Sequence, residues 1–361
     1  FCGVRGVQPQ SESVWRQARR HGIPVVAFVN KLDRPGASMD RVLDSMRERL
    51  HATPLAIQVP VGSESGFEGI VDVITRRTHL FSESGAAVAA DLPAAAVSAV
   101  ASARSLLIEC LAETDDVIMA RFLNDEEPTA EELRAALRRA TLSGQVVPVT
   151  CGSALRNQGV SALLDAVVSY LPSPLDVRQV AGVEPESGRP VVRHIGDAEP
   201  FSALAFKTVG DAPGGRLTYM RVYSGTARPG MSVRNARTGT VERIAGVLQI
   251  HANMAEERSE AFSGDIAAVT GLSVDTHTGD TLCAPDAPIA LNAIRFPEPV
   301  VSVAIEARQA GDSERLHSAL RELALDDPTL RVHTDGYTGQ TLLAGMGELH
   351  PDIRSEERRV G

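Results

Sequence analysis

The tetrad Asn30-Lys31-Leu32-Asp33 has the residue types that recognition of a guanine base requires. A carboxylate at Asp33 can accept two hydrogen bonds, from the N1–H and the exocyclic amine of guanine, a pair of donors that adenine does not present. The amide of Asn30 can reach the acceptor edge of the base, and the aliphatic stem of Lys31 can lie over the ring face. Because four common residues recur by chance, the context of the tetrad decides its meaning.

A second motif, TCGSAL at residues 150–155, supports the guanine interpretation. The backbone N–H of Ala154 can donate a hydrogen bond to guanine O6, while the hydroxyl of Ser153 is expected to steady Asp33. Either motif alone is compatible with an ordinary turn after a strand. Found together, the two motifs favour a site that reads a guanine base.

Each motif follows an apolar run, at residues 23–29 and 145–149 respectively. Such runs predict buried strands of a parallel sheet, and open α/β sheets bind ligands at the carboxyl ends of their strands. We therefore expect the two motifs to meet at one edge of a sheet. Apolar residues at helical spacing predict the flanking helices, over 10–22, 39–50 and 159–170.

Phosphate-binding chemistry is absent from these 361 residues, because no G-x-x-x-x-G-K-[ST] segment occurs and no D-x-P-G segment precedes Asn30. That loop would cradle the β- and γ-phosphates and place a hydroxyl on Mg²⁺. We accordingly expect no catalytic residue and no metal ligand in this sequence. The chain starts at Phe1 without an initiator Met, and we interpret it as an internal part of a longer protein.

Composition narrows the class of protein. The length suits two to three domains, and 43% hydrophobic residues suffice for real cores. The net charge of −10 argues against nonspecific nucleic-acid binding over the whole surface. Four widely separated cysteines predict neither a disulfide framework nor a zinc site, and they favour a reducing compartment. No run of 18 apolar residues is present, so we expect no membrane span.

The two motifs lie unusually far apart for a minimal guanine-nucleotide domain, since Ser153 follows Asn30 by 123 positions. We expect the excess to be an inserted subdomain over about 63–145, with a strand pair at 69–74 and 77–81. The Ala-rich stretch 89–103 predicts a solvated, loosely packed helix. Thr129, with Pro128 before it and acidic residues after it, predicts a helix N-cap.

Further along, the pattern changes twice. Prolines at 172 and 174 end a helix and mark a domain boundary, after which short alternating strands with Gly and Pro turns over about 186–288 predict a β-barrel. Beyond Phe296-Pro297-Glu298-Pro299, a β-α-β-β-α order predicts a small α+β sandwich like the ferredoxin-like fold. The last eight residues, 354–361, do not continue the strand and helix patterns before them. We interpret them as an artefactual tail, translated from a sequencing-adapter sequence.

Taken in order, the motifs resemble those of elongation factor G, the ribosomal translocase GTPase, over nearly all of residues 1–353. Position 351 is Pro where the family usually has Leu, and the Ala-rich stretch 84–103 is unlike typical members. The stretches that carry the resemblance are GVQPQSESVWRQA at 6–18, NKLDRPGA at 30–37, TCGSALRNQGV at 150–160, LPSPLDV at 171–177, EPFSALAFK at 199–207, RVYSGT at 221–226, GDTLCAPDAPI at 279–289, DPTLRVHTD at 327–335 and GQTLLAGMGELH at 339–350.

The resemblance implies a multidomain fold of α/β, β and α+β parts. Residues 1–172 would be the carboxyl half of a P-loop GTPase G domain with the inserted G′ subdomain, 173–290 a β-barrel second domain, and 297–353 a ferredoxin-like third domain. The P-loop, both switch regions and the fourth and fifth domains would lie outside. The residues that would bind guanine in GTP or GDP are Asn30, Lys31, Asp33, Ser153, Ala154 and Leu155, and the ligands of Mg²⁺ would lie in the missing part.

The resemblance also implies a function. The intact parent would be a ribosome-dependent GTPase that promotes tRNA–mRNA translocation, with ribosomal RNA and proteins as partners, whereas this fragment alone would be inactive. We expect a cytoplasmic monomer that does not contact a membrane. A ribosome-recycling or ribosomal-protection paralogue is an alternative, and so is a non-catalytic ribosome-binding module. Candidate contacts with rRNA phosphates in the barrel domain are Arg193, Arg216, Arg221, Arg228, Arg234 and Arg237.

Overall fold

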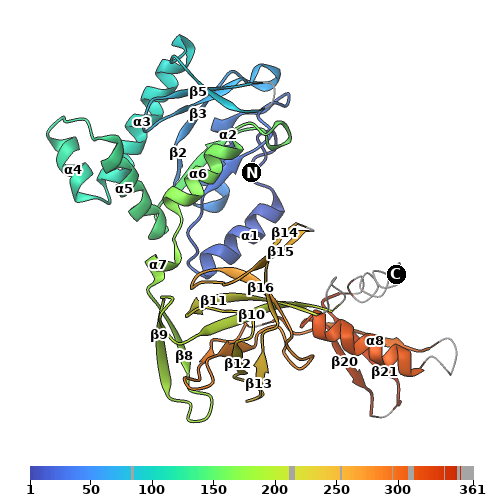
Figure 1. Ribbon diagram of the computed structural model, residues 1–361. Coiled ribbons are helices and arrows are strands. Elements are labelled where there is room, and N and C mark those ends of the chain that lie inside the picture. The colour runs from blue at the N-terminus through green and yellow to red at the C-terminus, as the bar shows by residue number, and fades with distance from the viewer. Residues whose placement is uncertain are drawn as a thin grey trace. The chain divides into compact units, whose positions relative to one another are not determined.

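A computed structural model describes residues 1–82, 85–210, 216–252, 254–294, 296–307, 313–336, 338–347 and 350. The chain divides into two compact units, Phe1–Pro172 and Ser173–Gly361. The predicted tail at 354–361 lies outside the described residues. Figure 1 shows the elements of both units.

A three-stranded parallel sheet forms the centre of the first unit, with the strand order β1-β7-β2. Its strands are β1 (Ala27–Val29), β7 (Val147–Cys151) and β2 (Pro54–Ala56). Every residue of β7 is buried, as expected for the middle strand of a parallel sheet covered on both faces. Strand β1 occupies the last three residues of the predicted run 23–29, whereas β7 starts two residues after the beginning of the run 145–149 and extends through Cys151.

The start of the chain extends this sheet beyond β1. The N–H of Asn30 donates to the carbonyl of Phe1 at 2.9 Å, and the N–H of Gly3 donates to the carbonyl of Asn30 at 2.8 Å. Cys2 and Asn30 thus form a parallel bridge. As a result, the backbone of Asn30 is fixed from the side opposite to β7.

The predicted helices of this unit form close to their expected bounds. In α2, Ser38 caps the helix by accepting a hydrogen bond from the Arg41 N–H, and the apolar residues at helical spacing are buried. These side chains share a core with β1 and β7. The helices that flank the sheet are α1 (Pro9–Arg20), α2 (Met39–Leu50) and α6 (Val160–Tyr170), with the short η3 (Ala154–Arg156) before α6.

An inserted segment lies between β2 and β7, and it is coloured light blue to teal in Figure 1. It holds a four-stranded antiparallel sheet, in the order β3-β4-β5-β6, and three helices. The predicted N-cap at Thr129 is confirmed, and the structure adds a capping box in which Glu132 is its partner. Its elements are β3 (Gln58–Val61), η1 (Glu64–Gly66), β4 (Gly69–Asp72), β5 (Thr78–Phe81), β6 (Ala87–Ala90), η2 (Ala94–Ala96), α3 (Val97–Ala112), α4 (Asp116–Leu123) and α5 (Ala130–Leu142).

The expectation of one solvated, loosely packed helix over 89–103 holds only in part, because most of the stretch is exposed but only its last residues are helical. The stretch begins inside strand β6 and enters α3 only at Val97. Within the stretch, only Ala96 and Val100 are buried, whereas the later part of α3 packs tightly through Leu107 and Leu111. Arg104 is also buried and donates to the carbonyls of Val73 and Ile74 at 3.0 and 2.8 Å, which fixes α3 to the segment after β4.

The second unit is built around an eight-stranded antiparallel sheet that curls into a barrel-like domain, as predicted (Figure 1). Its core gathers small and aliphatic side chains such as Val222, Val233 and Leu282. The strand order is β13-β12-β17-β10-β11-β16-β14-β15. The strands are β10 (Ser202–Val209), β11 (Leu217–Ser224), β12 (Ser232–Asn235), β13 (Val241–Arg243), β14 (Gly246–His251), β15 (Met254–Arg258), β16 (Ile266–Thr270) and β17 (Thr281–Cys283).

Two smaller sheets complete the second unit. One has the order β18-β8-β9, and the other, β19-β21-β20, forms the α+β part with α8, whose Leu320 packs on Leu330 and Leu343. The predicted second helix of that part, from Gly347, runs into residues outside the described ranges. The remaining elements are α7 (Pro174–Val177), β8 (Gln179–Val183), β9 (Pro190–His194), β18 (Ala290–Leu291), β19 (Val301–Ile305), α8 (Ser313–Asp326), β20 (Arg331–Thr334) and β21 (Thr341–Gly345).

Two helical stretches, Ala94–Ala112 and Val160–Val177, are long and apolar enough to cross a membrane by length and composition alone. The first of them places one face in the core of the first unit and carries the buried Arg104. The second contributes Ala166 and Tyr170 to the same core. Helices of this kind also occur inside soluble proteins, so the absence of a membrane partner stays a prediction.

Candidate guanine-recognition site

The structure brings the two sequence motifs together at the carboxyl ends of neighbouring parallel strands. Val29, the last residue of β1, is paired in register with Cys151, the last residue of β7. Asn30 follows the first strand and Gly152 follows the second. This is the edge at which open α/β sheets bind ligands, so the topology places both predicted loops where a base could be read.

Hydrogen bonds connect the loops. The Ala154 N–H donates to Oδ1 of Asn30 at 3.0 Å, and the same oxygen accepts the Lys31 N–H at 2.7 Å. The Leu32 N–H donates to the carbonyl of Gly152 at 3.2 Å. The Asn30 amide therefore joins the two motifs, and guanine O6 would share the Ala154 N–H with it.

Lys31 adopts a left-handed backbone conformation, with φ of 70°. A side chain other than that of glycine rarely adopts this region, and such strain tends to occur at functional sites. Here it turns the chain sharply between Asn30 and the buried Leu32. The Lys31 side chain is exposed, as the proposed position over a ring face requires.

Two glycines allow the second loop to close tightly. A Cβ on Gly152 would lie 2.2 Å from the carbonyl oxygen of Gln158, and one on Gly159 would lie 2.4 Å from the carbonyl oxygen of Cys151. Ser153 and Gln158 exchange two backbone hydrogen bonds of 3.0 Å across this turn. The turn therefore depends on the absence of a side chain at position 152.

The carboxylate of Asp33 pairs with Arg156, whose Nε lies 3.3 Å from Oδ2. The Asp33 side chain is 11% exposed, so it is held at the site but still accessible. Arg156 is absent from the predicted set, because nothing in the TCGSALRNQGV stretch shows that its side chain folds back toward the tetrad. A guanine base would meet a carboxylate already oriented by a cation.

The expected bond between Ser153 and Asp33 is not formed. Ser153 is buried, and its Oγ has no hydrogen-bond partner among the described residues. Leu155, at the other end of the loop, is 89% exposed and so presents an apolar side chain at the surface. Of the six predicted residues, Asn30 and Asp33 thus make polar contacts through their side chains, while Lys31 and Ala154 do so through their backbone N–H groups.

Gln58 is a second residue absent from the predicted set. Its side chain is 4% exposed, and its Oε1 accepts the Cys151 N–H at 3.0 Å. This bond holds the last residue of β7 directly before the base-reading loop. Burial also raises the pKa of the Cys151 thiol to about 12, so this side chain is a neutral packing group here.

Three family models match consecutive parts of the chain. The model for the GTP-binding domain of elongation factor Tu matches residues 1–173, and the model for domain 2 of elongation factor Tu matches 215–283. The model for domain III of elongation factor G matches 296–359. The order of these domains is decisive. The chain belongs to the elongation factor G type of translational GTPases.

A solved structure agrees with this assignment. A crystal structure of a protein from Thermus thermophilus superposes with a TM-score of 0.82 at 29% sequence identity. The alignment covers 99% of this chain and 51% of that one. This elongation factor G-type chain therefore spans about half the length of the protein it matches.

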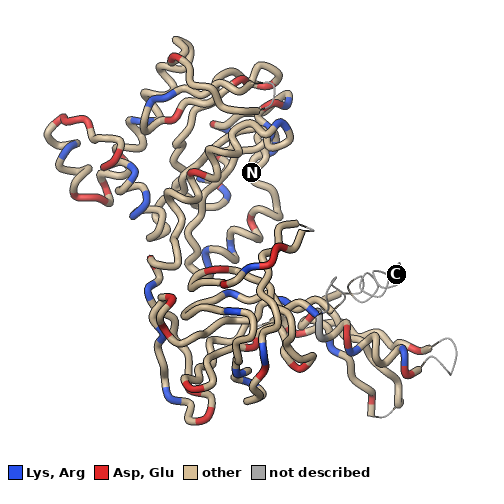
Figure 2. Tube along the Cα trace, in the orientation of Figure 1, with Lys and Arg blue, Asp and Glu red and all other residues tan. Residues whose placement is uncertain are grey.

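In the described part of the barrel-like domain of the elongation factor G-type chain, basic and acidic residues alternate along the backbone. Figure 2 shows Lys and Arg interspersed with Asp and Glu along this unit. Of the six arginines proposed to meet rRNA, Arg228, Arg234 and Arg237 pair with the carboxylates of Glu260, Glu186 and Asp280. The positive charges of these three arginines are therefore partly neutralised by carboxylates within the chain.

The third-domain motif that ends in Gly-Glu-Leu-His has only part of its residues described. Glu348 and Leu349 lie outside those ranges. The resemblance to elongation factor G implies that this motif packs near the switch regions, which stays a prediction. Within the described ranges, no group of three or more His, Cys, Asp or Glu is placed to hold a metal ion.

Proposed function

We propose that this chain supplies guanine-base recognition, together with the second and third domains, to a ribosome-dependent GTPase that promotes tRNA–mRNA translocation. The GTP-binding family and the domain order support a translational GTPase. The observation that carries the base-reading role is the contact between the two loops, through the bond from Ala154 to Asn30. GTP or GDP is the proposed ligand.

Base selectivity follows from the polar groups at the site. Asp33 accepts the N1–H and the exocyclic amine of guanine, while the Ala154 N–H and the Asn30 amide face its acceptor edge. Adenine offers an acceptor where guanine has N1–H, so it would leave the carboxylate unpaired. A site built to hydrogen-bond one polar edge rejects an analogue that lacks it by about 10⁴-fold.

Hydrolysis needs phosphate-binding groups that this sequence does not contain. We propose that the complete protein hydrolyses GTP by positioning and electrostatic stabilisation, and that the 361-residue chain alone does not. The chain alone is expected to bind GDP weakly, because most of the affinity for a nucleotide comes from its phosphates. A submicromolar Kd for GDP would contradict this expectation.

A titration of the chain with nucleotides tests the base-reading role. GDP should shift the NMR signals of Lys31, Asp33 and Ala154, whereas ADP at the same concentration should not. Asp33→Asn should remove the preference for GDP and favour xanthosine diphosphate, which has a carbonyl where guanine has its amine. Asp165→Asn, on the exposed side of α6, is the matched control. Equal shifts by GDP and ADP would contradict the proposal.

Translocation itself is tested with the complete gene product on programmed ribosomes. The proposal predicts mRNA movement by one codon that depends on GTP. The ribosome-recycling or ribosomal-protection alternative predicts subunit splitting or drug release without such movement. The long insert between β2 and β7 favours the elongation factor G branch, but it does not separate translocation from recycling. A non-catalytic ribosome-binding module would show neither activity.

A further inference from the structure

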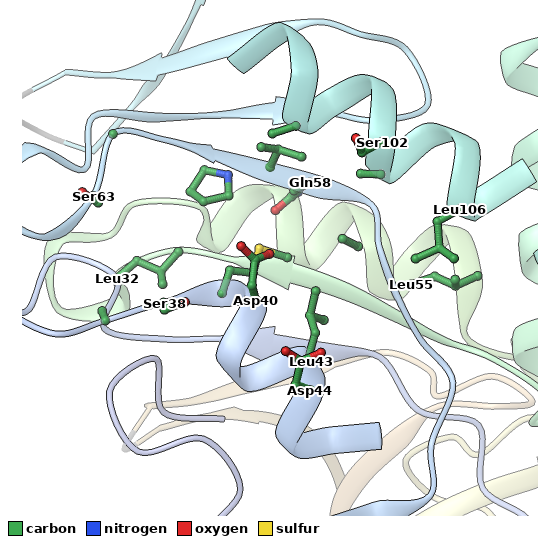
Figure 3. Close-up of a pocket in the computed structure, with 18 of the residues that line it drawn as sticks. Leu32, Ser38, Asp40, Leu43, Asp44, Leu55, Gln58, Ser63, Ser102 and Leu106 are labelled. Atoms are coloured by element: carbon green, nitrogen blue, oxygen red, sulfur yellow. The ribbon is translucent and has the colours of Figure 1, made fainter. Parts of the chain in front are cut away.

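A cavity of about 600 Å³ lies within the first unit, beside the base-reading loops. Its walls are α2 and α3, and strand β3 and the residues just before it line the space between them (Figure 3). The volume is in the range of pockets that hold small organic molecules. None of the six predicted guanine-binding residues lines it, so base recognition does not account for this space.

The cavity exists because α3 presents small side chains to it. Ala99, Ser102 and Ala103, at helical spacing, line this side, and Leu106 closes one end together with Leu55 (Figure 3). Apart from Leu106, the large residues of this part of α3, Leu107 and Leu111, lie in the core instead. The Ala-rich composition of the insert thus leaves space where larger residues would close the gap between the two helices.

Two polar groups stand out in the otherwise largely apolar lining. Asp40, an exposed residue in the first turn of α2, directs its carboxylate into the cavity in Figure 3, and it forms no ion pair among the described residues. Asp44, one turn further on, is already paired with Arg47 at 2.7 Å. The amide of Gln58 is almost fully buried, and its nitrogen makes no hydrogen bond within the described ranges.

These groups define the chemistry of a ligand. An apolar body would contact Leu43, Leu55 and Leu106, and a protonated amine would pair with Asp40. The remaining carboxylate in the lining is neutralised by Arg47, so the cavity carries one uncompensated negative charge. An anion of the same shape would be repelled, and the charge therefore distinguishes between otherwise similar molecules.

The cavity is also connected to both base-reading loops. Leu32, which lines it, is part of the first motif and donates its N–H to the carbonyl of Gly152. Gln58, which lines it as well, accepts the N–H of Cys151 just before the second motif. A molecule that contacts Leu32 and Gln58 thus reaches each loop through a single residue.

We propose that this cavity binds a small apolar amine and that its occupation changes the position of the base-reading loops. The binding part stands on the cavity alone, whereas an effect on nucleotide affinity rests on the proposed function. A ligand can shift the equilibrium between two arrangements of the base-reading loops only by the difference in its affinity for these arrangements.

The test is an NMR titration of the ¹⁵N-labelled 361-residue chain with tryptamine, and with indole-3-propionate as an anion of similar shape. Tryptamine should bind with a Kd on the order of 1 mM, as its small size allows. Its binding should shift the signals of Asp40 and Gln58 and also those of Gly152–Ala154. Indole-3-propionate should bind at least about ten-fold more weakly.

Variants locate the site. Asp40→Asn should weaken tryptamine binding about ten-fold or more, since it removes the charge-assisted contact. Asp116→Asn, which changes the first-turn acid of α4 instead, should leave binding unchanged. Ala103→Leu adds bulk to the cavity wall and should also weaken binding. For each variant, the NMR signals of residues away from the substitution should be unchanged, which shows that the fold is retained.

The outcomes separate the parts of the proposal. Absence of saturable shifts at Asp40 and Gln58, or equal binding of the amine and the acid, would overturn the cavity site. Shifts at these two residues without any change at Gly152–Ala154 would overturn the coupling. If tryptamine binds and moves the loops while GDP shows no base preference, the proposed function fails and the cavity site stands.

Discussion

Replacement of Gly152 by Ala should destabilise the first unit, because the added Cβ has no space. It would lie 2.2 Å from the carbonyl oxygen of Gln158 and 2.9 Å from Cζ of Phe28. The carbonyl belongs to backbone held by the hydrogen bonds between Ser153 and Gln158, so it cannot move without breaking them. Overpacking costs about 1–3 kcal/mol and each lost hydrogen bond about 1 kcal/mol, which gives an expected loss of about 3 kcal/mol.

Urea unfolding monitored by tryptophan fluorescence measures this loss. Trp15 is the single Trp of the sequence and donates its indole N–H to the carbonyl of Leu50, so it reports on the first unit alone. Gly66→Ala is the matched control, because a Cβ there meets no atom within 4 Å, and its effect should stay within about 0.5 kcal/mol. Gly152→Ala unfolding at the same urea concentration as Gly66→Ala would refute the reasoning.

Three further predictions concern buried polar groups. Arg104→Met should cost about 3 kcal/mol or more, because buried carbonyls lose their donor, and Arg104→Lys should cost less in the same urea assay. Burial opposes ionisation of Asp280, but hydrogen bonds, foremost from Arg237, hold its pKa below the usual 3.8. Because the pKa of Asp280 is lower in the folded than in the unfolded chain, its contribution to stability is present above about pH 4 and is lost as the pH falls further. Hydrogen exchange of β17 should become faster over this pH range, and Asp280→Asn should abolish the pH dependence. Cys151, with a pKa of about 12, should resist alkylation by iodoacetamide at about pH 8 until the first unit unfolds, whereas the partly exposed Cys2 should react. Peptide mapping of the alkylated cysteines measures the difference.

The sequence predicted those features that depend on local pattern. Apolar runs before Asn30 and Thr150 indicated parallel strands, and the strands β1 and β7 lie there. The bounds of α2 and the N-cap at Thr129 were also predictable, because capping and helical spacing are short-range signals. Placement of the two motifs at one sheet edge followed from the general topology of such folds.

Features that depend on distant contacts were not predictable in this way. Alanine carries no strong periodic signal, so the strand β6 could not be distinguished from the helix that follows it. The ion pair between Asp33 and Arg156 and the bond between Gln58 and Cys151 join residues that are far apart in the sequence. The left-handed turn at Lys31 also has no glycine to mark it.

The strand order β1-β7-β2 has a consequence for synthesis of the chain. The middle strand, β7, is made last, after the whole insert has been synthesised, whereas both outer strands precede the insert. Nascent β1 and β2 cannot pair with each other without blocking the gap that Val147–Cys151 must enter. The base-reading edge is therefore completed late in the folding of this unit, and the insert has time to fold first as a separate hairpin and helix assembly.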